Sequence, residues 1–146
     1  MSAKEMVMNR QRQAGFTLIE VVIVVAILGI ISAFAYNGYQ RYVQNTYRAD
    51  AQRSLMDIAQ RLERCFTQRN DYSECVDGGQ GATWESENGH YEISITDLEK
   101  TTFTLIATPQ GVQAERDGDR CATLTLTHTG RRDSTGSEER DDCWGL

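Results

Sequence analysis

The stretch GFTLIEVVIVVAILGIISAFA, from Gly15 to Ala35, decides the fold of this chain, because Glu20 is its only charged residue. At about 1.5 Å per residue, a helix of this length would be about 30 Å long, which matches the hydrocarbon core of a bilayer. A carboxylate inside such a segment costs about 2.5–3.5 kcal/mol on insertion scales, so it is retained where it has a partner or a task. The stretch therefore predicts a membrane-spanning helix, and Glu20 is its candidate functional residue.

A short polar and basic leader, residues 1–15, precedes this stretch. Its charged residues are Lys4, Glu5, Arg10 and Arg12. An ordinary secretory signal is cut after its apolar region, whereas here the small residues Ala14 and Gly15 come before it. Cutting after Gly15 would keep the anchor, and the basic leader predicts that this end stays in the cytoplasm while the rest lies on the other side. Arg41 and Arg48 on the far flank weaken this bias without reversing it.

The run from Gly15 to Glu20, followed by the apolar run 24–30, resembles the class III signal of type IV pilins. The resemblance implies that a membrane-embedded prepilin peptidase cuts between Gly15 and Phe16 and then N-methylates Phe16. It also implies that Glu20 faces the charged amine of a neighbouring subunit in the filament. Since desolvation cancels much of the attraction between two such charges, we expect Glu20 to specify the register of the subunits. The alternative is a plain single-pass anchor with an incidental glutamate.

The rest of the chain is large enough for one small acidic head. About 110 residues follow the anchor, which suffices for one domain and not for two. The whole chain has 15 Lys and Arg residues against 21 Asp and Glu residues. Cleavage after Gly15 would remove three bases and one acid, leaving 12 against 20 and a net charge of −8. A head this acidic is a poor generic binder of nucleic acid, so we predict no specific nucleic-acid partner.

All four cysteines lie beyond the membrane segment, where disulfides persist. They are Cys65, Cys75, Cys121 and Cys143. Three connectivities are possible. We favour Cys65 with Cys75 and Cys121 with Cys143, and both pairs would then close local loops. Each would contribute about 2–4 kcal/mol, which matters for a small core. No pair has C-x-x-C spacing, and His90 and His128 show no ligand spacing to the cysteines, so we predict no metal site.

Beyond Ala35 the helical period continues as an amphipathic stripe that ends near Gln68. Its members are Tyr39, Tyr42, Val43, Tyr47, Ala51, Leu55, Ile58, Leu62, Cys65 and Phe66. We therefore predict a single helix whose first half lies in lipid and whose second half packs against the head. Many type IV pilins carry a proline at the position that Asn37 occupies here. Without it, we expect a bend or weak point at Gly38, since glycine costs a helix about 1 kcal/mol relative to alanine, and a second weak point at Gly29.

The region after the helix predicts a loop and then a small antiparallel sheet. Residues 70–89 are polar and glycine-rich, which indicates a connection. Three short segments then alternate between apolar residues and mostly threonine or polar residues, which predicts strands with one face on the core. Their apolar faces carry Tyr91, Ile93 and Ile95, then Phe103, Leu105 and Ala107, then Ala122, Leu124 and Leu126. The predicted fold class is α+β, with the amphipathic half of the helix packed on this sheet.

The tail from Gly130 to Leu146 is charged and has no period, so it needs a tether. A bridge from Cys121 to Cys143 would make a loop that resembles the disulfide-bounded D-region of type IV pilins. The segments 121–127 and 142–144 are similar to the C-terminal part of PilE-like minor pilins. Trp144 is either a core aromatic beside the disulfide or an exposed interface anchor.

These observations predict the domain organisation of a pilin. The expected parts are a removed leader (1–15), a transmembrane and polymerisation helix (16–35) and a periplasmic head (36–146) that contains the αβ-loop (70–89), the sheet (90–128) and the D-region (121–143).

The leading functional hypothesis is a type IV pilus subunit, in particular a minor pilin that supports pilus biogenesis, adhesion or twitching motility. The implied partners are prepilin peptidase, other pilin subunits and an inner-membrane assembly platform. The protein would lie in the inner membrane before assembly and in the extracellular pilus afterwards. The alternatives are a pseudopilin of type II secretion and an adhesin or DNA receptor with a basic patch around Arg131, Arg132 and Arg140.

An enzyme is disfavoured because the chain has no H-E-x-x-H, no G-x-S-x-G and no phosphate-binding glycine loop. We therefore predict no catalytic residue and no cofactor. Four aspartates near the C-terminus could be proposed as carboxylate pairs or calcium ligands, but a solvated acidic face is favoured. They are Asp117, Asp119, Asp141 and Asp142.

Overall fold

The structure is a computed structural model, which we describe over residues 15–145. The predicted leader, apart from Gly15, lies outside the described residues. The chain divides into two compact units, one that ends at Gly38 and one that begins at Tyr39. We call the second unit the head.

Helix α1, Leu18–Arg69, contains 52 residues and begins and ends close to the predicted positions. Asn37 and Gly38 are both helical, so α1 continues without interruption through the position where many type IV pilins have a proline. Length and apolar composition make α1 the one helix among the described residues that could cross a membrane. In the head, α1 continues as the amphipathic half that the stripe predicts.

The sheet has five antiparallel strands in the sequential order β1-β2-β3-β4-β5. The strands are β1 (Thr83–Glu85), β2 (Tyr91–Thr96), β3 (Thr104–Pro109), β4 (Thr123–Thr127) and β5 (Arg132–Thr135). The three central strands confirm the prediction from alternation, and Leu105 is opposite Ile95 on one side and Leu126 on the other. The prediction missed β1 and β5, the two edge strands.

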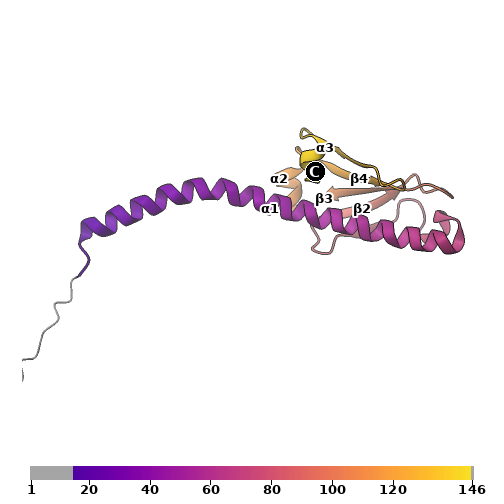
Figure 1. Cartoon of the computed structure of the whole chain (residues 1–146), viewed down its shortest axis with the longest axis horizontal. Coiled ribbons are helices and arrows are strands. Elements are labelled where there is room, and N and C mark those ends of the chain that lie inside the picture. Colours follow the sequence, from indigo (N-terminus) through magenta and orange to yellow (C-terminus); the bar gives the residue numbers. More distant parts are fainter. Residues whose placement is uncertain (1–14, 146) are drawn as a thin grey trace, which may run out of the picture. The chain divides into compact units, whose positions relative to one another are not determined.

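The core of the head lies between this sheet and α1 (Figure 1). Ala51 and Leu55 of α1 are fully buried, and so are the inward residues of β2 and β3. Burying one such large aliphatic side chain stabilises a fold by about 1.5–3 kcal/mol. The prediction that the stripe packs against the head was wrong for its first two residues, because Tyr39 and Tyr42 are 64% and 70% exposed.

Three short helical segments complete the head: η1 (Tyr72–Cys75), α2 (Gly111–Asp117) and α3 (Arg140–Trp144). The predicted loop 70–89 therefore contains η1 and β1, and the tail predicted without a period contains β5 and α3. In η1 the carboxylate of Asp71 accepts a hydrogen bond from the backbone N–H of Ser73 at 2.9 Å, which caps the turn. Figure 1 shows α2 and α3 at the same end of the sheet.

Candidate functional site

The first candidate site is the start of α1. Gly15, Phe16 and Thr17 are exposed and precede the helix. The hydroxyl of Thr17 accepts a hydrogen bond from the backbone N–H of Glu20 at 3.3 Å, so Thr17 caps the helix. Glu20 lies in the first turn, where the positive end of the helix dipole favours a carboxylate. Within residues 15–145 this carboxylate has no ion-pair partner.

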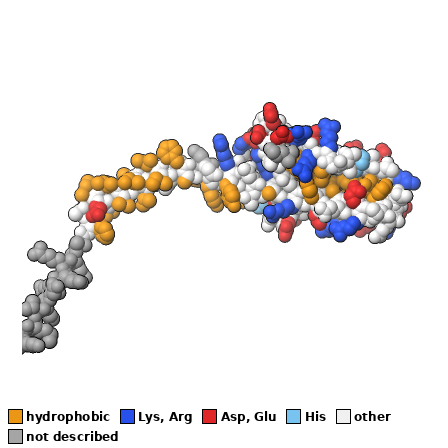
Figure 2. Space-filling model, in the orientation of Figure 1, with side chains coloured by type: hydrophobic (Ala, Val, Ile, Leu, Met, Phe, Trp, Pro, Cys, Tyr) orange, Lys and Arg blue, Asp and Glu red, His pale blue; other side chains and the backbone are white. Residues whose placement is uncertain are grey.

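The apolar side chains of the first unit have no protein partner within the described chain. Phe16 is 84% exposed, Leu18 82% and Val24 50%. Figure 2 shows hydrophobic side chains over this part of α1, whereas charged side chains of both signs are scattered over the visible face of the head. Ser32 donates its hydroxyl proton to the carbonyl of Leu28 at 2.7 Å, which satisfies the side chain without water. A helix that is apolar all round is suited to lipid or to contact with other such helices.

The second candidate site is a buried ionic cluster in the head, centred on Arg48 of α1. Its guanidinium donates two hydrogen bonds to Asp117, at 2.6 Å from Nε and 2.5 Å from Nη2, in a bidentate pair. Nη2 also lies 2.9 Å from a carboxylate oxygen of Glu138. The side chain of Arg48 is 6% exposed and that of Asp117 is 0% exposed. The hydrogen bonds that Arg48 donates to Asp117 raise the pKa of Arg48, so the guanidinium stays charged.

Further contacts tie the cluster to the C-terminal loop and to α2. Arg48 donates a hydrogen bond from Nη1 to the carbonyl of Asp142 at 3.2 Å. Arg120 pairs with the other carboxylate oxygen of Glu138 and also donates to the side chain of Gln44 at 3.1 Å. The cluster therefore joins α1, the end of α2 and both ends of the loop from Cys121 to Cys143.

Glu138 gives this cluster a dependence on pH. Burial alone would raise the pKa of Glu138, but hydrogen bonds from Arg120 and Arg48 together lower the pKa below its ordinary value of 4.5. A carboxylate whose pKa is lower in the folded state stabilises the fold above its unfolded pKa, and this stabilisation is lost as the pH falls through the folded pKa.

We expect the urea midpoint of the head to fall as the pH drops from 5 towards 3, and to fall less steeply in Glu138→Gln. The tryptophan fluorescence of the full chain in detergent micelles, from Trp84 and Trp144, would report the transition. Glu139→Gln is the matched control, because Glu139 is the exposed neighbour. Equal slopes in the two variants would contradict the assignment.

A separate buried carboxylate holds the turn between β1 and β2 against α1. Asp50 accepts hydrogen bonds from the hydroxyl of Ser86 at 2.7 Å and from the amide of Asn88 at 2.9 Å. The ring of His90 stacks on that of Tyr47 at a centroid distance of 3.7 Å. This turn is therefore positioned by α1 in the same way as the C-terminal loop.

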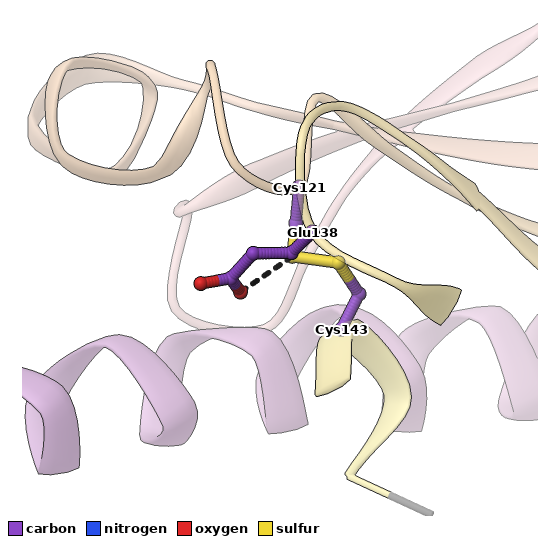
Figure 3. A group of neighbouring side chains, drawn as sticks. All are labelled: Cys121, Glu138 and Cys143. Carbon is purple, nitrogen blue, oxygen red and sulfur yellow. Dashed lines mark hydrogen bonds between the residues drawn. A yellow bond between two sulfur atoms is a disulfide. The ribbon is translucent and has the colours of Figure 1, made fainter. Parts of the chain in front are cut away.

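The structure pairs Cys65 with Cys75 and Cys121 with Cys143, the two pairs that we favour from the sequence. Figure 3 shows the second disulfide with the carboxylate of Glu138 beside it, where an oxygen lies 3.6 Å from Sγ of Cys121. These three side chains are close enough together to hold a metal ion. Sulfurs that are bonded to each other are not thiolate ligands, however, and Glu138 is already engaged by two guanidinium groups. This group of side chains therefore serves to hold the C-terminal loop in place and is not suited to bind a metal ion.

The arginines of the suggested basic patch lie around β5 and α3. Arg131 is exposed and lies 3.4 Å from a carboxylate oxygen of Asp133, and Arg140 pairs with Asp141 at 2.8 Å. The guanidinium of Arg132 stacks over the ring of Trp144 at 5.3 Å, a cation–π contact. The charges of Arg131 and Arg140 are thus partly neutralised by aspartates, and the guanidinium of Arg132 is partly covered by the ring of Trp144.

Trp144 is 3% exposed and donates its indole N–H to the carbonyl of Asp133 at 2.8 Å. Of the two interpretations of Trp144, the structure shows the core aromatic. The expected solvated acidic face was wrong for Asp117, which is fully buried, while Asp119, Asp141 and Asp142 are exposed as expected.

The sequence reasoning missed Arg48, Asp117 and Glu138 as a group. One signal was present, because Arg48 precedes Ala51 by three residues and Leu55 by seven, so it lies on the apolar stripe. A charged residue on a buried face needs a partner. The partners follow it by 69 and 90 residues, and no local pattern points to them.

The apolar N-terminal helix, the antiparallel sheet on its second half and the disulfide-closed C-terminal loop define a type IV pilin. Comparison of the sequence with family models gives a match at residues 38–125 to the family described as type IV minor pilin ComP, DNA uptake sequence receptor. Residues 10–36 match the prokaryotic N-terminal methylation motif. The chain belongs to the ComP family of type IV minor pilins, whose members are structural subunits of pili.

Curated relatives agree with this assignment. A fimbrial protein of Dichelobacter nodosus is 32% identical over 108 residues, which are 70% of this chain and 65% of the relative. The type IV major fimbrial protein FimA of the same organism is 36% identical over 70 residues, 48% of this chain and 45% of FimA. The chain thus spans about half to two thirds of the length of these relatives. Among solved structures, the minor pilin PilV of Neisseria meningitidis is 19% identical with a TM-score of 0.49, over 67% of this chain and 92% of PilV.

Proposed function

We propose that prepilin peptidase cuts this minor pilin after Gly15 and methylates Phe16, and that the subunit then enters a type IV pilus through α1. The observation that carries this proposal is the exposed apolar surface of α1 from Leu18 to Phe34, which has no partner within the described chain. Gly15 and Phe16 support the cleavage position because both are exposed and lie outside the helix. Proteases cut exposed, non-helical backbone.

Before assembly, the subunit would be held in the inner membrane with its head in the periplasm. The basic residues of the leader support this orientation through the positive-inside bias. Two disulfides in the head fit an oxidising compartment. The partners would be other pilins, which offer the same kind of apolar helix, and the membrane platform that assembles them.

Intact-mass analysis of membrane-extracted protein tests the processing step. We expect a mature chain that begins with methylated Phe16 in cells with prepilin peptidase, and the uncut chain in cells without it. A mature chain with any other N-terminus in cells that contain the peptidase would refute the proposed cleavage after Gly15.

Glu20 is proposed to set the register between subunits through the amine of a neighbouring Phe16. An unpaired carboxylate in this apolar surface costs about 2.5–3.5 kcal/mol, and a partner amine would remove that cost. We expect Glu20→Gln to be cut normally but to enter pili poorly, because the amide keeps the size and loses the charge. The measurement is the amount of the variant in sheared pili relative to that in membranes. Thr17→Ser, which keeps the helix cap, is the control, and normal incorporation of Glu20→Gln would refute this role.

A second candidate function is binding of DNA, which the family description supports. The exposed guanidiniums of Arg131 and Arg140 are the groups of the C-terminal loop that could contact phosphates. The acidic balance of the head and the pairing of these arginines with Asp133 and Asp141 oppose strong binding.

Binding of duplex DNA to the full chain, measured over a range of salt concentrations, tests this function. If the two arginines contact phosphates, Arg131→Gln with Arg140→Gln should reduce the slope of log K against log salt by about 0.9 for each phosphate that is no longer neutralised. Arg53→Gln with Arg64→Gln, on exposed positions of α1, is the control. Absence of binding at low salt would exclude the DNA receptor.

A further inference from the structure

An exposed aromatic and basic patch lies at the beginning of the head. It consists of Tyr39 and Tyr42 on α1 and Arg116 on α2, which line one hollow, and of Arg41, which lies on another side of the same turn of α1. The two tyrosines are 64% and 70% exposed, which is far more than their place on the stripe predicts. With Val43 and Arg116 they line an open hollow of about 350 Å³. Two large aromatic side chains in water beside an open hollow call for an explanation.

The charges of the patch are free among the described residues. Neither Arg41 nor Arg116 forms an ion pair within residues 15–145, although the head has an excess of acidic groups. Arg116 is held in place through its backbone, since its carbonyl accepts a hydrogen bond from the side chain of Gln44 at 3.2 Å. The patch therefore presents one unpaired guanidinium, that of Arg116, at the hollow lined by the two tyrosines, and a second, that of Arg41, on another side of α1.

The patch is close to the end of the apolar run along the chain. Tyr39 follows Ala35 by four residues, which is about 6 Å of helical rise and at most about 14 Å of extended chain. Side chains of a helix lean towards its N-terminus, so the rings of Tyr39 and Tyr42 lean towards the N-terminal end of the head. The polar layer of a bilayer is about 5–7 Å thick on each side of its hydrocarbon core. The short separation along the chain therefore allows the patch to reach this layer.

We propose that Tyr39, Arg41, Tyr42 and Arg116 bind the headgroup layer of an anionic phospholipid bilayer while the subunit is held in the membrane. Tyrosine is amphipathic, with an apolar ring and a polar hydroxyl, and it collects at this boundary. Guanidinium groups bind lipid phosphates in the bidentate manner. The backbone of nucleic acid also offers phosphates, but it has no adjoining apolar layer to cover the two rings. The patch would hold the head at the membrane surface until the subunit is extracted.

This inference rests on the proposed membrane-held state, so the experiment tests the two separately. The full chain is reconstituted in vesicles of phosphatidylethanolamine and phosphatidylglycerol that contain brominated lipid, and one tryptophan is added per variant. Ile27→Trp reports the membrane span, Tyr42→Trp reports the patch, and Gln60→Trp reports a distant exposed position on α1. Trp84 and Trp144 contribute the same background to all three variants.

We expect bromine to remove the added emission at position 27 and at position 42, and to spare that at position 60. Quenching at position 27 without quenching at position 42 would refute the contact between the patch and the headgroup layer, but it would support the membrane span. No quenching at 27 would overturn the membrane-held state and the patch with it. Equal quenching at 42 and 60 would also overturn the patch, because it would show no preference for this end of the head.

The arginines are tested by placing the bromine on one lipid only. In Tyr42→Trp, we expect brominated phosphatidylglycerol to quench the added emission more strongly than the same fraction of brominated phosphatidylcholine. Arg41→Gln with Arg116→Gln should reduce the local enrichment of the anionic lipid by about fivefold for each arginine. Arg53→Gln with Arg64→Gln is the matched control, and an equal effect of both pairs would overturn the assignment. No quenching difference at position 42 without DNA, together with duplex-DNA binding that Arg41→Gln with Arg116→Gln weakens, would show that the guanidiniums prefer nucleic acid and would overturn the lipid site.

Discussion

Asp117→Ala is expected to lower the free energy of unfolding of the head by about 3–5 kcal/mol, because it leaves the buried guanidinium of Arg48 without its main partner. Asp117 is fully buried and accepts two hydrogen bonds from Arg48 and one from the amide of Gln113 at 3.0 Å. Glu138 alone cannot replace these bonds, since its own carboxylate is shared with Arg120. Urea unfolding of the full chain in micelles, followed by tryptophan fluorescence, measures the change.

Two further variants separate the buried charge from the loss of a side chain. Asp119→Ala, an exposed aspartate two residues later, should change the free energy by less than about 0.5 kcal/mol. Arg48→Met combined with Asp117→Leu removes both charges and should recover most of the stability that Asp117→Ala loses. A double variant as unstable as Asp117→Ala would show that the cost lies in packing and not in an unpaired charge.

Gly136→Ala is expected to be the second strongly destabilising change. Gly136 has φ of +126°, and a Cβ at this position would lie 2.2 Å from the carbonyl oxygen of Arg120 and 2.9 Å from the backbone nitrogen of Ala122. Backbone strain of about 1–3 kcal/mol and overpacking of about 1–3 kcal/mol would add, for a total of about 2–6 kcal/mol. The contact lies where the end of β5 passes the residues on either side of Cys121, so the C-terminal loop should detach first.

Gly130→Ala is the matched control for this effect. Gly130 also has a positive φ, of +77°, but a Cβ there would meet nothing within 4 Å. It should cost only about 1–2 kcal/mol, the value for a left-handed conformation without a clash. Protease sensitivity of the segment after Gly136, with the unfolding midpoint, would distinguish the two variants, and equal effects would contradict the close approach.

The elements with a strong period were predictable from the sequence. The apolar run and the stripe predict α1 because they persist over many turns, and β2, β3 and β4 alternate because one face is covered by α1. The edge strands do not show this pattern. β1 has three residues inside a glycine-rich segment, and β5 reads Arg132-Asp133-Ser134-Thr135, whose pairing with β4 is supplied by the tertiary fold.

The candidate site divides in the same way. Gly15, Phe16 and Glu20 lie within six consecutive residues, so a short sequence motif contains all three, and their roles remain predictions. The ionic cluster joins residues that are far apart along the chain, and charged residues are assigned to the surface unless a partner is known. The sequence analysis wrongly placed Tyr39 and Tyr42 on the face of the helix that packs against the head. A repeating apolar pattern identifies one face of a helix, but it does not say which residues of that face the rest of the protein covers.

The position of Arg48 in the chain has a consequence for the order of synthesis. Arg48 leaves the ribosome early, whereas Glu138 and the carbonyl of Asp142 are among the last groups to be made. Before these groups have been synthesised, the guanidinium of Arg48 can donate hydrogen bonds only to water or to Asp117. A chain that stops before Glu138 therefore carries a core charge that is incompletely neutralised and lacks the second disulfide as well. Arg48 thus links the closure of the head to the end of the chain, because two of its acceptors belong to the C-terminal loop.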